Sequence, residues 1–216
     1  MTNMKLGERQ GLQPRAYRMT ARADAAEATA GAIVAAARGL FAERAYDQVS
    51  LPVIAERAGV TVQTVLRRFG SKDELFAAAA RQRSAEIRAD REAAPPGDIS
   101  RLVAHYERWG QEQAHLLAQD ARVPAIRAIT DDGRRYHRDW IARAYGPRLS
   151  KLPTATRRRR LAQLTALTDL TVWRLLRGDL DLDADQTAAA IRELADACLS
   201  PDRTRPLARA RHERDN

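Results

Sequence analysis

The sequence predicts an all-α protein with a compact N-terminal part and a larger C-terminal helical bundle. Alanine, the strongest helix former, supplies 42 of the 216 residues. No segment sustains the alternation of apolar and polar residues that is typical of a half-buried β-strand. One strong interruption, Pro95-Pro96-Gly97, marks a domain boundary. We expect a mobile basic arm over residues 1–24, domains over 25–92 and 95–200, and a basic tail over 201–216.

The first two helices are predicted from an apolar stripe and from a start signal. Over residues 25–44, Ile33, Ala37, Leu40 and Phe41 fall on one face of a helix. A turn follows, and Ser50 is then expected to cap a short helix that has a proline in its first turn and ends at Gly59.

The next two helices are defined by caps at both ends. Thr61 is expected to cap a helix over residues 62–69, which Gly70 ends. Ser71 and Glu74 have the spacing of a capping box, which predicts a longer fourth helix reaching about residue 91. Beyond the boundary, further helices are expected near 98–119, 122–130, 131–146, 154–178 and 184–199.

Composition excludes several classes of protein. The lone cysteine, Cys198, can form neither an internal disulfide nor a cysteine-based zinc site. No run of 18 apolar residues predicts a membrane span, and no apolar leader is present, so a cytoplasmic location is expected. The formal net charge of +9 indicates either a polyanionic partner or a solubility habit.

Residues 51–69 have the spacing of a helix-turn-helix. Ala55 is small where two helices would cross, and Gly59 gives the tight turn its backbone freedom. Apolar residues fill the space between the helices, while polar residues project from the second. The alternative is an ordinary helical hairpin with a glycine turn. Arg57, Arg67, Arg68 and Lys72 lie in a 16-residue window that contains no acid.

The segment IAERAGVTVQTVLRRFGSKDELFAAA, followed by a larger helical domain, resembles the tetracycline-repressor (TetR) family of bacterial regulators. The similarity is strong over roughly residues 28–80, and the ending FGSKDEL is the family's marker of the join between the recognition helix and the fourth helix. The resemblance implies a helix-turn-helix DNA-binding domain with its connecting helix over residues 25–92. It also implies a ligand-binding and dimerisation domain over residues 95–200.

The resemblance implies that the recognition helix and the start of the fourth helix contact DNA. Lys72 should hold a phosphate, and Gln63 is suited to reading an adenine edge. The family commonly has a small residue where Gln63 stands and a phosphate-binding tyrosine where Leu66 stands. The expected DNA-binding residues are Thr61, Gln63, Thr64, Arg67, Arg68, Lys72 and Arg57.

The C-terminal part carries all three tryptophans, and the family implies a ligand pocket there. Pockets are mostly apolar and aromatic with a few polar groups. The candidate pocket residues are Tyr106, Trp109, Tyr136, His137, Trp140 and Trp173, with ordinary core packing as the alternative. No histidine pair has the spacing and carboxylate support of a metal site, and we expect no cofactor or metal.

Two apolar stripes on the last two predicted helices suggest a dimer interface. Paired with their copies, these helices would form a four-helix interface, as the family does. The alternative is that both stripes belong to the core of one chain. The candidate interface residues are Leu161, Leu164, Thr168, Val172, Leu175, Thr187, Ile191 and Leu194.

Together these observations predict a homodimeric transcriptional regulator, not an enzyme. We expect it to be a repressor that a small molecule releases from a double-stranded, pseudo-palindromic DNA operator. The same fold could instead act as an activator, or as a ligand-binding or partner-binding protein without operator release. No nucleophile motif, phosphate-binding glycine loop or paired carboxylates indicate an enzyme.

Overall fold

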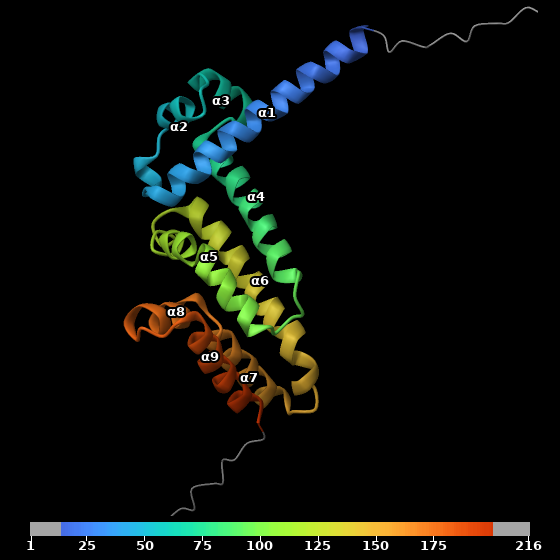
Figure 1. Ribbon diagram of the computed structural model, residues 1–216, viewed down its shortest axis with the longest axis vertical. Helices are drawn as coiled ribbons and strands as arrows, with labels where there is room; N and C mark the ends of the chain where they lie inside the picture. Colours follow the sequence, from blue (N-terminus) through green and yellow to red (C-terminus); the bar gives the residue numbers. More distant parts are fainter. Residues whose placement is uncertain (1–13, 201–216) are drawn as a thin grey trace, which may run out of the picture. The chain divides into compact units, whose positions relative to one another are not determined.

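The computed structural model describes residues 14–200, with side chains from residue 20 onward, and all regular elements in this range are helical (Figure 1). The expected all-α fold is therefore confirmed. The elements are α1 Pro14–Glu43, η1 Tyr46–Gln48, α2 Leu51–Arg57, α3 Val62–Phe69, α4 Lys72–Glu92, α5 Ile99–Leu117, α6 Pro124–Leu149, α7 Thr154–Leu167, α8 Leu170–Arg174, η2 Leu175–Asp179 and α9 Ala184–Leu199.

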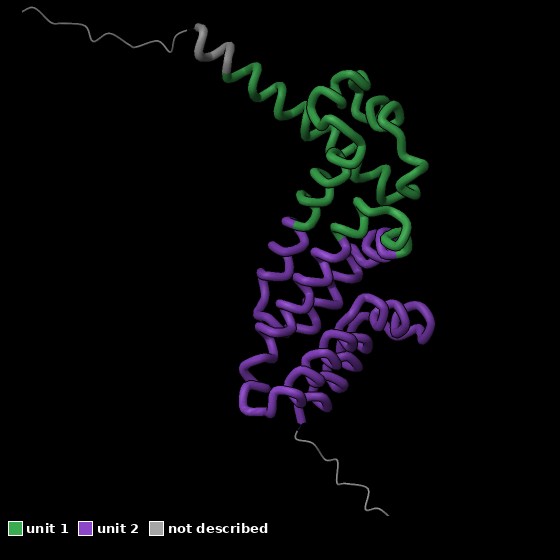
Figure 2. The backbone as a smooth tube through the Cα atoms, turned by 180° about the vertical axis from the view of Figure 1, so that it is seen from behind, with its two compact units in different colours: residues 1–84, 118–129 green, residues 85–117, 130–216 purple. Residues whose placement is uncertain are grey.

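The chain divides into two compact units (Figure 2). Unit 1 contains residues 1–84 and 118–129, and unit 2 contains residues 85–117 and 130–216. Both α4 and α6 therefore run through the chain positions where the units are divided. The expected tail over 201–216 and residues 1–13 of the expected arm lie outside the described residues.

Helix α1 begins earlier than predicted. Residues 14–24 were expected in the arm, but they form the first turns of the helix. Pro14 occupies the first helical position, where a missing N–H costs nothing, and no glycine or proline follows until Gly31.

The apolar side of α1 packs into the core of unit 1. Ile33 and Ala37 are fully buried, and Leu40 is almost so. Phe41 lies edge-on to Phe76 of α4, with 4.9 Å between ring centroids. By length and composition residues Thr20–Glu43 could also span a membrane, contrary to the expectation from the absence of an 18-residue apolar run. In this structure the apolar side chains of that segment supply the core of unit 1.

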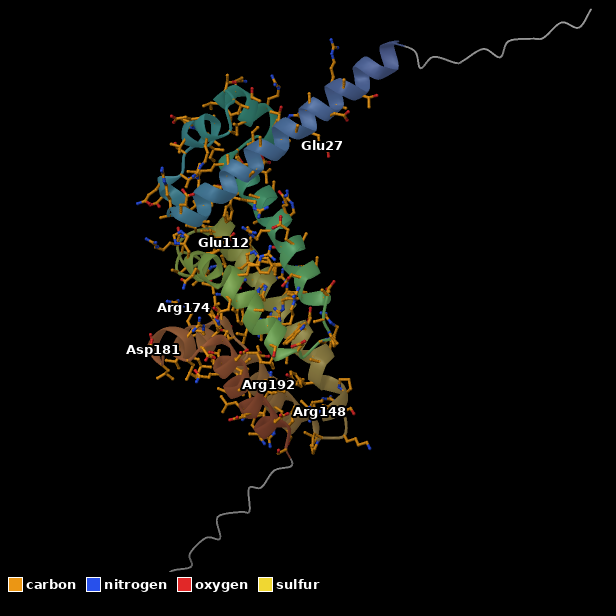
Figure 3. The ribbon with its side chains drawn as sticks, in the orientation of Figure 1. Glu27, Glu112, Arg148, Arg174, Asp181 and Arg192 are labelled. Carbon is orange, nitrogen blue, oxygen red and sulfur yellow. The ribbon has the colours of Figure 1, made fainter. Side chains whose placement is uncertain are left out.

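Unit 2 is built on an apolar cluster shared by α5, α6, α7, α8 and α9. Leu164 and Ile191 are fully buried in it, and Tyr106 and Trp173 pack there with ring centroids 5.9 Å apart. At its edge lies Arg192 of α9, which is labelled in Figure 3. Its Nη2 donates to the Ser100 hydroxyl of α5 across 2.9 Å.

Two predicted boundaries in the C-terminal part are wrong. The helices expected over 122–130 and 131–146 are one helix, α6, which continues through Gly133 and into Pro147. A Cβ at Gly133 would meet nothing within 4 Å, and the cost of one helical glycine, about 1 kcal/mol, does not break a helix whose other turns are packed. Pro147 lies in the last turn, so its missing N–H removes one backbone hydrogen bond and leaves the turns before it intact.

The helix expected over 154–178 is divided at Thr168–Asp169. Asp169 has an extended backbone, and its carboxylate accepts the Thr171 N–H at 2.9 Å, so it caps a new helix, α8. The turn that follows, η2, is a π-helical turn, a form that often occurs at functional sites.

Candidate functional site

Helices α2 and α3 pack as the two helices of a helix-turn-helix. Ile54, Ala55 and Val65 are buried between them and their neighbours. Gly59 has a φ of +66°, a left-handed conformation that glycine adopts without steric cost. This turn allows the Val60 N–H to donate to the Ala55 carbonyl at 2.9 Å.

The start of α3 is organised by two threonines. As predicted, Thr61 caps the helix, because its hydroxyl accepts the Thr64 N–H at 3.2 Å. The two hydroxyls also lie 3.0 Å apart. In contrast, Ser50 stands at the cap position of α2 without a capping side-chain hydrogen bond, so the expected role of its hydroxyl was wrong. A β-region backbone and Pro52 in the first turn are sufficient to start that helix.

The exposed face of α3 carries two polar side chains that the rest of the described chain does not engage. Gln63 and Arg67 are both exposed and form no side-chain hydrogen bond or ion pair with another described residue. Leu66 is also exposed, at 36%, in the place of the tyrosine expected from the resemblance. Gln63 and Arg67 are therefore the groups most free to contact a ligand.

The other two arginines of the acid-free window already have partners. Arg57 forms two hydrogen bonds with the carboxylate of Glu43, at 2.9 and 3.1 Å, which lower the pKa of that carboxyl group. Arg68 donates from Nη2 to the Ala26 carbonyl of α1 at 2.8 Å. Both pairs are exposed, so each stabilises the fold only slightly and could exchange for another partner.

Lys72 is half-buried at the first position of α4, and its ammonium is engaged within unit 1. Nζ donates to the carbonyls of Tyr46 and Val49, at 2.9 and 3.0 Å, and lies 4.1 Å from the centroid of the Tyr46 ring. These contacts hold the segment just before α2, so Lys72 positions the helix-turn-helix, and at most one of its N–H groups is left for a phosphate.

The expected pocket residues are mostly buried in unit 2, and of the six only Trp173 lines the open pocket described below. Trp109, Trp140 and Trp173 are between 3 and 6% exposed. The Tyr106 hydroxyl donates to the Thr168 carbonyl at 2.9 Å, and the Thr168 hydroxyl lies 3.1 Å from Nε2 of His137. Much of the set thus packs as core, the alternative that the sequence had left open.

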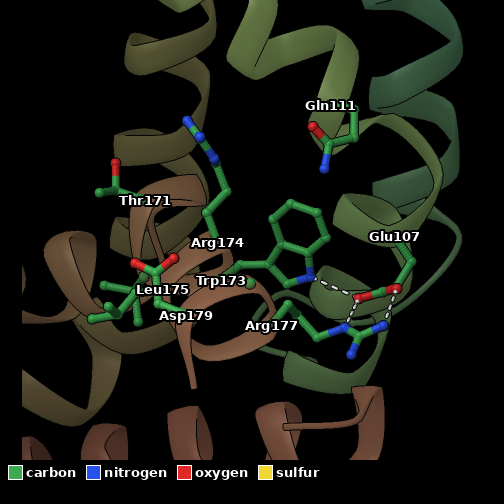
Figure 4. A pocket seen from close by; sticks show the side chains of 10 residues that line it. Glu107, Gln111, Thr171, Trp173, Arg174, Leu175, Arg177 and Asp179 are labelled. Atoms are coloured by element: carbon green, nitrogen blue, oxygen red, sulfur yellow. Dashed lines mark hydrogen bonds and ion pairs between the residues drawn. The ribbon is translucent and has the colours of Figure 1, made fainter. Parts of the chain in front are cut away.

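Trp173 lies on an open pocket of about 710 Å³, formed by α5, α8 and η2 (Figure 4). Its indole N–H donates to Glu107 at 2.8 Å, and Arg177 binds the same carboxylate at 2.7 and 3.1 Å. The hydrogen bond from Arg177 lowers the pKa of Glu107. This pocket is polar at its rim, and its charged groups largely neutralise one another.

A second polar group lies inside unit 2 around Arg91, which the sequence did not single out. Arg91, in the last turn of α4, is 6% exposed. Its guanidinium lies 4.5 Å from the ring centroid of Trp140 and 5.3 Å from that of Tyr136. No sequence signal separates Arg91 from the other basic residues, because only tertiary packing buries it.

Two histidines accompany this group. Burial, and then the charge of Arg91, lowers the pKa of His105 to about 3 and that of His137 to about 4. His137 lies 3.4 Å from Nη2 of Arg91, and Nε2 of His105 lies 2.9 Å from the Gln113 amide nitrogen. Both imidazoles are therefore neutral at physiological pH.

The structure separates the expected interface stripe into two groups. Leu164, Thr168, Thr187 and Ile191 are completely buried within the chain, so they have no surface to offer a second copy. Leu164 and Ile191 belong to the apolar cluster of unit 2, so the burial of these four residues favours the alternative that this part of the stripes is core of one chain. Leu161 and Val172 are half-buried, whereas Leu175 and Leu194 are 46% and 45% exposed.

Residues 33–79 match the family model of the bacterial regulatory proteins of the tetR family. Among solved structures, a transcriptional regulator from Rhodococcus sp. Rha1 is 22% identical with a TM-score of 0.58, covering 79% of this chain and 95% of its own. NalD, the secondary repressor of the MexAB-OprM multidrug efflux pump in Pseudomonas aeruginosa, is also 22% identical with a TM-score of 0.58, covering 82% and 99%.

The multidrug binding protein EbrR, solved with imidazole, is 20% identical with a TM-score of 0.52, covering 88% of this chain and 97% of its own. At these identities the structural similarity establishes the fold. A comparison with curated proteins found no match to this sequence.

Proposed function

We propose that this chain, whose residues 33–79 match the family model of the tetR family of bacterial regulatory proteins, is a homodimeric, cytoplasmic repressor released from its operator by a small molecule. The observation that carries the proposal is the face of α3, where Gln63 and Arg67 are exposed and not engaged by the rest of the described chain. A recognition helix must present such groups to base edges and phosphates in the major groove.

The DNA contacts we propose divide into specific and positioning ones. Gln63 reads a base edge, and Arg67 binds a phosphate, with Arg57 and Arg68 free to exchange their exposed partners for phosphates. Thr61 and Thr64 keep the start of α3 in place, and a hydroxyl of either can accept or donate one further bond.

A matched pair of substitutions tests this division. Gln63→Ala should weaken operator binding about tenfold with little change for unrelated DNA, because it removes a base contact. Arg67→Ala should weaken binding to the operator and to unrelated DNA alike, and it should reduce the slope of log affinity against log salt concentration by about one. Gel shifts with DNA from upstream of the protein's own gene, over a salt series, measure both effects.

The control for this pair is Arg81→Ala, an exposed arginine of α4 outside the helix-turn-helix. Equal behaviour of the Gln63 and Arg67 variants would contradict the assigned roles. The absence of any sequence-selective binding by the unaltered protein would favour a ligand-binding or partner-binding protein, a reading to which Leu66 in the place of tyrosine also points.

We propose that the dimer forms through the exposed apolar residues near the end of unit 2. Of the four large apolar side chains that are exposed in the described chain, three, namely Leu175, Leu180 and Leu194, fall between residues 175 and 194. Exposed apolar side chains grouped in this way are typical of an association surface.

Leu194→Glu should convert the dimer into a monomer, since it places a charge in the apolar contact of both copies at once. Size-exclusion chromatography with light scattering measures the mass. Leu194→Met, which keeps the side chain apolar, should remain dimeric. A Leu194→Glu protein that kept the dimer mass would place the interface elsewhere.

The proposed mechanism is a shift between two conformers. The effector prefers the conformer whose recognition helices do not match the operator, so its binding favours release. Helix α4 is suited to carry this change along the chain, because its first residue, Lys72, holds the segment before α2 and its last turn contains Arg91.

A further inference from the structure

We propose that the effector is an aromatic carboxylate whose anionic group is bound by Arg91. The inference rests on the proposed function, since it names the class of molecule that unit 2 would sense. The observation behind it is the guanidinium of Arg91, which is buried in unit 2 and pairs with no carboxylate of the described residues.

Arg91 is 94% removed from solvent, yet no described carboxylate pairs with it. Its contacts are a hydrogen-bond distance of 3.4 Å to Nδ1 of His137 and the ring faces of Tyr136 and Trp140. A buried ion is costly unless it is paired and hydrogen-bonded, and a guanidinium carries five N–H donors. Most of these donors have no acceptor in the described chain.

The charged and titratable groups around Arg91 do not supply the missing anion. From α5 and α6 they are Tyr106, Tyr136 and Arg143, of which none carries a negative charge at neutral pH. Two acids of unit 2 are held by other arginines, Asp132 by Arg88 and Asp90 by Arg101. Two other acids lie near this group: Glu92 is exposed on α4, and the Asp169 carboxylate, which acts on His137 and Tyr106, caps α8 by accepting the Thr171 N–H.

Two further polar atoms in unit 2 are buried and unsatisfied. The Tyr136 hydroxyl has no hydrogen-bond partner, although its ring lies beside the guanidinium. Nδ1 of His105 has none either. With the Gln113 amide donating to Nε2 of this imidazole, the ring proton lies on Nδ1, which leaves a donor without an acceptor. The guanidinium and the Tyr136 hydroxyl beside it thus both offer hydrogens to an oxyanion, and the His105 N–H is a further unsatisfied donor in the same unit.

The side chains around Arg91 indicate what kind of group carries the carboxylate of the ligand. Trp140 stacks on His137 at an interplanar angle of 16°, and Tyr136 lies on the same helix, so flat rings surround the guanidinium. A carboxylate matches the planar fork of an arginine with two parallel hydrogen bonds. One unpaired charge balances one negative charge, which favours a carboxylate over a phosphate dianion.

The same arrangement explains how the protein tolerates Arg91 before a ligand binds. The residue lies in the last turn of α4, where the carbonyl groups of the helix end carry a partial negative charge. Ring faces also attract a cation weakly. These interactions hold the guanidinium in place, but a carboxylate would bind it far more strongly.

The substitution Arg91→Met distinguishes a ligand-binding role of this arginine from a structural role. It removes an unpaired buried charge and keeps an unbranched apolar stem, so the melting temperature of the free protein should rise by about 2–4 °C. A structural role predicts a fall instead. Arg143→Met is the control, since it removes an exposed charge 6.0 Å from the Tyr136 ring centroid.

Binding is measured with benzoate, phenylacetate and 1-naphthoate at millimolar concentration, each against its neutral amide, by thermal shift and tryptophan fluorescence. At least one carboxylate should stabilise the unaltered protein and the Arg143→Met variant, while Arg91→Met should bind it at least about tenfold more weakly. Stabilisation by no carboxylate, equal stabilisation by the amides, or full retention by Arg91→Met would each overturn the proposal.

These measurements contain no DNA, so they can fail independently of the proposed function. Gel shifts with the same carboxylate then test release. If the carboxylate binds but does not release the protein from DNA, the carboxylate site is supported and the repressor mechanism is contradicted. If the protein binds an operator but no carboxylate, the proposed DNA binding is supported and the carboxylate site is contradicted.

Discussion

The free energy of unfolding of unit 2 is expected to fall by about 4 kcal/mol between pH 7.5 and pH 5, because two buried histidines are neutral in the folded state. Burial, reinforced by Arg91, lowers the pKa of His105 to about 3 and that of His137 to about 4. In the unfolded chain both would titrate near their ordinary value of about 6.5.

The sign follows from which state takes up protons. Below about pH 6.5 the unfolded chain binds a proton at each imidazole while the folded protein does not, so acid favours unfolding. Each histidine contributes about 2 kcal/mol at pH 5, and the loss continues until the pH reaches the folded-state pKa values.

Urea unfolding followed by tryptophan fluorescence measures this effect. All three tryptophans, Trp109, Trp140 and Trp173, lie in unit 2 with both histidines. His105→Gln and His137→Gln should each remove about half of the pH dependence. An unfolding free energy that stays constant from pH 7.5 to pH 5 would show that neither imidazole is held neutral.

Gly110→Val is expected to destabilise unit 2 by about 3 kcal/mol, because no side chain fits at this position of α5. A Cβ there would lie 2.7 and 2.9 Å from two ring carbons of Trp173 and 3.2 Å from a methyl group of Leu170. Trp173 cannot move away freely, since its indole N–H is bound to Glu107 and its ring packs against Tyr106.

The matched control is Gly133→Val on α6, where a Cβ would meet nothing within 4 Å. Valine and glycine have similarly low helix propensity, so the control should change stability by less than about 0.5 kcal/mol. Denaturant unfolding measures both variants, and the tryptophan emission of Gly110→Val should also shift as Trp173 is displaced. Equal stability of the two variants would mean that Trp173 gives way at little cost.

The N-terminal helices were predictable because their determinants are close together in the chain. Gly59 at the turn, Thr61 at the cap and the buried pair Ile54 and Val65 lie within 12 residues. Such short-range patterns depend little on the rest of the fold. The residues expected to touch DNA stay a prediction, and their existing partners, such as Glu43 for Arg57, depend on packing from α1.

The C-terminal helices were harder to predict because distant contacts outweigh local signals there. Two helices were expected over 122–130 and 131–146, but the structure has one continuous helix with buried residues on both sides of Gly133. The apolar period through residues 161–175 suggested one helix. The structure has two, because the carboxylate of Asp169 caps the start of α8. Asp169 was the signal in the sequence that could have shown this break. Local propensity is a weak prior wherever tertiary packing decides.

The sequence by itself determined the fold class, the helix-turn-helix and the similarity of residues 33–79 to the tetR family, because these depend on periodicity, caps and turns encoded over a few residues. Only the tertiary structure decided which apolar stripes are core and which basic residues matter inside the protein. Thr187 and Ile191 are buried, and Arg91, one of 37 basic residues, is a buried charge that pairs with no carboxylate of the described residues. Burial and pairing depend on residues far apart in the chain, so no local pattern contains them.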